Sequence, residues 1–166
     1  MKLISADGAK LELRLVGYQF GQPDSTRAGE SDGSTGLYAD WDANWLVIHG
    51  DALTSGGQSW SFTDPCLTTW EAEGLALWLS AAARGDEAAG EAVFTEPNLS
   101  FVCDGVAEGR VHMRVRFSHE SLPSWLPREP VGWQAGEYYL ALEVSCADVA
   151  EAARAWDADR LQFPVR

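Results

Sequence analysis

The chain has 166 residues, of which 46% are hydrophobic and 22% charged, and this fits one globular domain, residues 1–166, with a substantial core. Its formal net charge is −13, and so strong a negative field repels phosphate backbones and disfavours direct binding of nucleic acid. No apolar run approaches the roughly 18 residues that a membrane-spanning helix needs, so we expect no membrane association.

The acidity has two readings. It could only keep the protein soluble, or it could steer and accelerate the encounter with a basic protein partner.

The three cysteines, Cys66, Cys103 and Cys146, are odd in number and far apart, which favours reduced thiols in a cytoplasmic protein. Asp7 and Lys10 interrupt the N-terminal region before the apolar core of a signal peptide could form.

The first half of the chain reads mainly as strands. Alternating apolar residues predict four of them, at 1–4, 10–16, 44–53 and 60–63. The first two form a hairpin through Ala6-Asp7-Gly8, and Asp64-Pro65 should stop the fourth because proline removes a backbone donor. Between the second and third strands lies the longest irregular stretch, 17–42, which contains five acidic residues and one basic residue.

A capped amphipathic helix is predicted over 68–84. Thr68 is placed as the N-cap and Glu71 completes a capping box, while Gly85 suits the position after the last turn. One apolar stripe at helical spacing comprises Ala72, Leu75, Ala76, Leu79 and Ala83, widened by Trp78. We expect this helix to lie across the inner face of a sheet made from the rest of the chain.

The second half of the chain repeats the pattern of strands followed by a helix. Strands are predicted at 93–103 (a single strand or a bent pair around Glu96-Pro97-Asn98), at 110–117 and at 137–144. Ser145 then caps a second helix, 146–157, and 161–165 is a short closing strand or an extended segment. The fold class is therefore α+β: a mostly antiparallel sheet of about 7–9 strands with two helices packed on it.

Motifs for catalysis, cofactors and metals are weak. Cys66, just before a helix, is the best nucleophile candidate, but its apolar neighbours also fit an ordinary core cysteine. Asp40-Trp41-Asp42-Ala43-Asn44 has the acid spacing that opens an EF-hand loop, without the glycine at its sixth position or the acid at its twelfth. We expect no catalytic residue, no cofactor and no metal.

Arg110, Arg114 and Arg116 form a basic stripe along one face of the strand 110–117. Such a stripe could hold an anion, but we favour pairing with acids on an adjacent strand, where Glu137 and Glu143 are available.

Several segments occur in an order that is distinctive of a family. They are Tyr18–Phe20, Asp42–Val47, Phe62–Glu71, Phe94–Phe101 and Phe163–Arg166. Over nearly its whole length the chain resembles the WapI family of bacterial immunity proteins. The resemblance implies a cytoplasmic antidote that binds a toxin domain of a contact-inhibition protein, a toxin that cuts tRNA in the name-giving member. It carries over no catalytic residue and no toxin-binding residue.

We therefore expect a non-enzymatic immunity protein, a monomer or weak dimer, that neutralises a basic, nuclease-type toxin domain by stoichiometric binding. The alternative is a small-ligand-binding or other soluble domain without catalytic activity. The expected binding surface combines acids of the first long loop with aromatics of a second, proline-rich loop at 118–136. Its residues are Asp24, Glu30, Asp32, Asp40, Asp42, Trp125 and Trp133.

Overall fold

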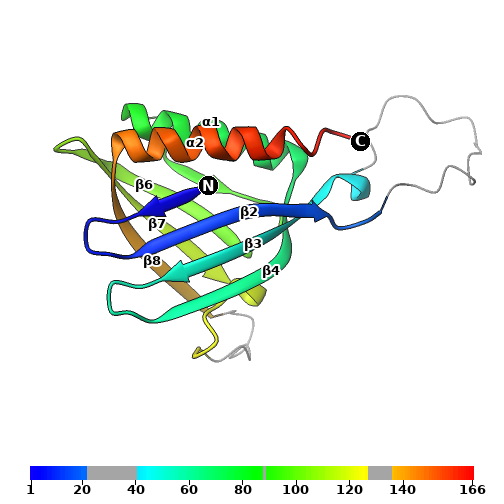
Figure 1. Ribbon diagram of the computed structural model, residues 1–166, viewed down its shortest axis with the longest axis horizontal. Helices are drawn as coiled ribbons and strands as arrows, with labels where there is room; N and C mark the ends of the chain where they lie inside the picture. Colours follow the sequence, from blue (N-terminus) through cyan, green and yellow to red (C-terminus); the bar gives the residue numbers. More distant parts are fainter. Residues whose placement is uncertain (22–40, 88, 127–135) are drawn as a thin grey trace, which may run out of the picture.

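A computed structural model describes residues 1–21, 41–87, 89–126 and 136–166 (Figure 1). Within these residues two helices and eight strands follow one another as β1 (Lys2–Ile4), β2 (Lys10–Tyr18), β3 (Trp45–Leu53), β4 (Ser59–Thr68), α1 (Thr69–Arg84), β5 (Glu91–Val93), β6 (Leu99–Ala107), β7 (Arg110–Ser118), β8 (Glu137–Ser145) and α2 (Cys146–Arg160). Two short 3-10 helices, η2 (Asp42–Asn44) and η3 (His119–Ser121), precede β3 and follow β7.

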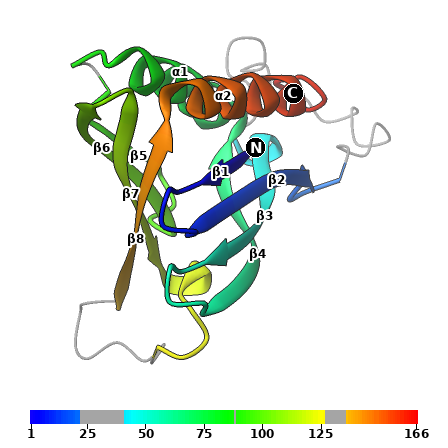
Figure 2. The same cartoon turned by 60° about the vertical axis from the view of Figure 1, so that its left-hand side comes forward.

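The predicted α+β class, the strand number and the antiparallel pairing are confirmed. The strands divide between two four-stranded sheets, in the orders β1-β2-β3-β4 and β5-β6-β7-β8. Chain order equals strand order in each sheet, so every strand within a sheet pairs antiparallel with the strand next to it in the sequence, across long connections (β2–β3 and β7–β8) as well as short ones. Both helices lie across the same end of the two sheets (Figure 2).

The two sheets are joined along both sides. At one side the β1–β2 turn bonds to β8, with Ala6 N donating to Glu143 O at 2.9 Å and Glu143 N donating to Ser5 Oγ at 2.9 Å. At the other side the Trp60 indole on β4 donates to Ser121 O at 3.0 Å. Helix α1 follows β4 directly, so it leaves the first sheet and lies over the core that both sheets enclose.

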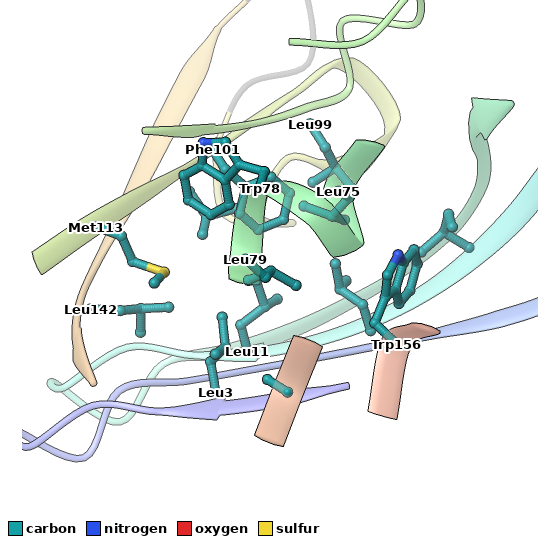
Figure 3. Packing of buried hydrophobic residues seen from close by; sticks show 14 of the residues in the cluster. Leu3, Leu11, Leu75, Trp78, Leu79, Leu99, Phe101, Met113, Leu142 and Trp156 are labelled. Atoms are coloured by element: carbon teal, nitrogen blue, oxygen red, sulfur yellow. The ribbon is translucent and has the colours of Figure 1, made fainter. Parts of the chain in front are cut away.

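One hydrophobic core lies between the sheets and under the helices. Leu3 and Leu11 of the first sheet, Phe101 and Met113 of the second, and Leu79 of α1 meet there, each at most 1% exposed (Figure 3). The helices are tied to each other within it, because the Trp156 indole of α2 donates to Ala72 O of α1 at 2.8 Å.

Helix α1 begins and ends as the sequence predicts. The Thr68 side chain accepts from Glu71 N, and a Glu71 carboxylate oxygen accepts from Thr68 N at 2.8 Å, which completes the capping box. Gly85 closes the helix at φ 73°, in the left-handed region that glycine tolerates best.

Three predicted boundaries are wrong. Strand β4 continues through Asp64-Pro65 to Thr68, because β4 is an edge strand with a bulge opposite Leu46/Val47, where a missing proline donor is tolerated. Helix α2 runs on to Arg160, and residues 161–165 form no strand. Residues 161–163 form a turn rather than an extended segment, with Leu161 N donating to Asp157 O at 3.3 Å and Phe163 N donating to Arg160 O at 2.8 Å. Among the described residues no helix is long and apolar enough to cross a membrane.

Candidate protein-binding site

An acidic hollow of about 460 Å³ lies where the two sheets meet near the start of α1. Its lining comes from the end of β2, the start of β3, β4, the β5–β6 connection and η3. The lining residues are Gln19, Phe20, Asp42, Trp45, Asp64, Pro65, Glu96, Asn98 and Glu120. Four of these nine carry carboxylates, and no Lys or Arg is among them. The hollow therefore concentrates negative charge.

Each carboxylate reaches the hollow by a different route. Asp42 begins the 3-10 helix that leads into β3, and Asp64 is presented by the stretch of β4 that continues through Pro65. Glu96 belongs to the connection between β5 and β6, and Glu120 to η3 after β7. The hollow is thus assembled by the pairing of strands from both sheets, and no single segment of the sequence contains it.

Asp64 is the acid most affected by this arrangement. Partial burial raises its pKa, and the neighbouring charges of Glu120 and Glu96 raise it further. The buried Asn98 amide donates a hydrogen bond to Asp64 and opposes this shift. The carboxylates thus repel one another, and a cationic group placed in the hollow would relieve that repulsion.

Aromatic side chains adjoin the hollow. Phe20 lines it and is 50% exposed, and Trp45 lines it as well. Trp41, which is 53% exposed, stacks on Trp70 of α1 with ring centroids 5.1 Å apart and planes inclined by 24°. Large aromatic side chains surrounded by charge are typical anchors of protein interfaces.

A clasp of polar contacts fixes the chain beside the hollow. The buried Asn44 side chain accepts from Arg166 N at 2.9 Å, donates to Arg166 O at 3.1 Å and accepts from Thr69 Oγ1 at 3.1 Å. The Arg166 guanidinium lies 3.4 Å above the Tyr18 ring and donates to Phe20 O at 3.1 Å. These contacts hold the end of β2, the start of β3 and the start of α1 together.

Only part of the predicted binding surface lies among the described residues. Asp42 lines the hollow. Trp125, 37% exposed, instead packs edge-on against Trp60 at 5.5 Å and lies 6.3 Å from Tyr138, and it does not line the hollow. The other predicted residues fall outside the described part of the chain: Asp24, Glu30, Asp32, Asp40 and Trp133.

Sequence reasoning missed three acids of the hollow. The sequence pattern indicates Asp64 only as part of the strand end at Asp64-Pro65 and Glu96 only as part of a bend, and it does not single out Glu120. Their spacings of 32 and 24 residues match no motif, because pairing of the sheets brings them together.

Cys66 is not an activated nucleophile. It lies in β4, it is 0% exposed, and burial raises the pKa of its thiol to about 12, with the Asp64 charge adding to the shift. At neutral pH it is a neutral core thiol, as the second interpretation of the sequence expected. Across the described residues no three His, Cys, Asp or Glu side chains are grouped as a metal site.

The basic stripe on β7 is paired across strands. Arg110 lies 3.3 Å from Glu143, and Arg116 lies 2.7 Å from Glu137, as predicted. Arg114 pairs instead with Asp104 on β6 at 2.8 Å, and this hydrogen-bonded guanidinium lowers the pKa of the Asp104 carboxyl. The stripe is therefore engaged within the sheet, and nothing in it favours an anion site.

Comparison with known proteins gives one result. Neither a search of the curated proteins nor a search of the solved structures finds a match. A scan against family models matches residues 2–164, nearly the whole chain, to the model described as the immunity protein WapI-like family, a family description that indicates a toxin-neutralising role. The chain belongs to the immunity protein WapI-like family.

Proposed function

We propose that this protein neutralises a basic, nuclease-type toxin domain by binding it in a stoichiometric complex through the acidic hollow, without catalysing a reaction. The observation that carries this proposal is the gathering of Asp42, Asp64, Glu96 and Glu120 in one hollow, in which no basic residue is found among the described residues of the lining. Family membership supports the class of function, and the charge of the hollow supports its choice as the binding surface.

The charge of the hollow suits such a toxin. A nuclease must attract the phosphate backbone of its substrate and therefore presents Lys and Arg. A carboxylate cluster attracts the same side chains, so an acidic antidote reaches them quickly and competes with the nucleic acid. The whole chain adds to the effect with its net charge of −13.

We also propose where the protein acts and in what oligomeric state. A single domain acting as a monomer in the cytoplasm would intercept a nuclease where its RNA substrate is present.

The alternative, a small-ligand-binding domain, is less well supported. The hollow has the volume of a ligand site, yet it is lined by four carboxylates where such sites are mostly apolar.

The test is rescue and binding with the C-terminal domain of the polymorphic toxin encoded beside this protein. The informative variant is Glu96→Gln/Glu120→Gln, because both side chains are exposed and neither forms an ion pair with a described residue. The control, Glu87→Gln/Glu151→Gln, removes the same amount of charge outside the hollow, from exposed residues beyond the C-terminal end of α1 and on the second turn of α2, where Glu151 forms an exposed ion pair with Arg154 at 2.6 Å.

Wild type and control should rescue growth and form a 1:1 complex. The hollow variant should bind more slowly, with an affinity that depends less on salt. Failure of the wild-type protein to rescue, or equal salt dependence in the two double variants, would contradict the proposal.

A further inference from the structure

Helix α1 is apolar on its outer side as well as on the side that faces the core. Trp70, Gly74, Leu77 and Ala81 are spaced four, three and four residues apart, so they follow one stripe along the helix. We refer to these four residues as the outer crest. The polar residues of the helix, such as Glu73 and Ser80, lie beside this stripe.

The charged residues of α1 do not interrupt this stripe. Glu71 caps the helix and also accepts from Thr95 N at 2.7 Å. Glu73 pairs with Arg160 of α2 at 3.4 Å, and Arg84 pairs with Asp86 at 2.7 Å. Each charge is thus directed toward a neighbouring element, and the outer crest itself carries none.

The outer crest is most accessible at Gly74 and Leu77, while Trp70 is half-buried and Ala81 packs partly against the core. Leu77 is 66% exposed, the highest value among the exposed large apolar side chains of the described residues. Above Gly74 a Cβ atom would meet nothing within 4 Å, so a partner can approach the helix backbone there. Exposed apolar stripes of this kind mark interaction sites more often than isolated apolar residues do.

The outer crest is continuous with the acidic hollow. Trp70 begins the stripe and stacks on Trp41, the residue before Asp42, which lines the hollow. One surface therefore combines an apolar ridge with a pocket of negative charge. That is the usual division between an apolar interface core and the charged groups that set orientation.

We infer that the outer crest of α1 is the apolar half of the interface, and that it covers an apolar patch of the basic toxin domain while a neighbouring Lys or Arg enters the hollow. This inference rests on the proposed function. A second copy of the chain fits less well, because two copies, each with a charge of −13, would bring their acidic hollows together.

The test measures the affinity of the same toxin domain for Leu77→Ala and Leu77→Asp. Both variants should fold, since the side chain is largely exposed. The matched control is Ile4→Asp, an apolar residue 52% exposed on β1, at the sheet edge opposite β4. We expect Leu77→Ala to weaken binding about tenfold, or about 1.4 kcal/mol, Leu77→Asp about a hundredfold, and Ile4→Asp to leave it unchanged.

Two results would overturn the inference while the proposed function stands. One is equal affinity of Leu77→Asp and Ile4→Asp in an assay where Glu96→Gln/Glu120→Gln still weakens binding. The other is a lower molar mass of free Leu77→Asp than of the free wild-type protein, measured by light scattering, together with an unchanged toxin affinity. That result would assign the outer crest to self-association. Absence of any complex with the wild-type protein would instead remove the proposed function itself.

Discussion

Replacing Asn44 with alanine tests how the chain beside the hollow is held in place. The Asn44 side chain is 0% exposed and, within the described part of the chain, makes three hydrogen bonds, two with the Arg166 main chain and one with Thr69 Oγ1. It therefore joins the start of β3 to the start of α1 and to the C-terminal segment. Asn44→Ala removes all three bonds without touching the hydrophobic core.

The expected loss follows from these contacts. A hydrogen bond in a folded protein contributes about 1 kcal/mol net, so the two bonds to the Arg166 main chain amount to about 2 kcal/mol. The Thr69 hydroxyl, in a residue only 6% exposed, also loses its acceptor, and an unsatisfied buried group costs about 1–3 kcal/mol. We predict that Asn44→Ala lowers the free energy of unfolding by about 3–5 kcal/mol, a large part of the 5–15 kcal/mol typical of a domain.

Urea denaturation followed by tryptophan fluorescence measures this change. With a slope of about 2 kcal/mol per molar urea, the midpoint should fall by about 1.5–2.5 M. Thr69→Ala removes one of the three bonds and should cost about 1 kcal/mol. A loss below about 1 kcal/mol for Asn44→Ala, or one equal to that of Thr69→Ala, would refute the assignment of Asn44 as the centre of the clasp.

Further predictions concern the hollow and the core. Folding raises the pKa of Asp64, so its charge destabilises the fold at neutral pH; Asp64→Asn should raise the melting temperature at pH 7, and this gain should vanish below the ordinary aspartate value of 3.8. A gain that persists at pH 3 would show that charge is not its cause. Because Cys66 is buried with a thiol pKa of about 12, iodoacetamide at pH 8 should leave it unmodified in the folded protein and alkylate it in urea, as mass spectrometry can show. Gly50→Ala would drive a methyl group into the Phe62 ring and should cost about 1–3 kcal/mol or more in a denaturation series; an unchanged midpoint would contradict the tight packing of β3 on Phe62.

The sequence predicts the elements of this fold where burial is periodic and local. Residues 110–117 alternate without a break, because β7 has one face in the core and one toward solvent. The capping box of α1 is equally local, since Thr68 and Glu71 are three residues apart. The strand end at Asp64-Pro65 was wrong because only the sheet order shows that β4 is an edge strand.

The candidate site is less predictable for the same reason. Asp42 was expected because it lies in an acidic stretch of sequence, whereas Glu96 and Glu120 join it only through the pairing of separate strands. Trp125 was expected at a working surface because aromatics in loops often anchor partners. In the structure its ring packs against Trp60, a contact between residues 65 positions apart. Local patterns carry no information on such contacts.

The most direct test of the account is isothermal titration calorimetry of this protein with the toxin domain encoded beside it, at low and at physiological salt. The account predicts a 1:1 complex whose affinity falls as salt rises. Glu96→Gln/Glu120→Gln should bind more weakly than Glu87→Gln/Glu151→Gln at low salt, and its affinity should fall less as salt rises. No heat of binding for the wild-type protein, or indistinguishable affinities for the two double variants, would contradict the claim that the acidic hollow neutralises a toxin.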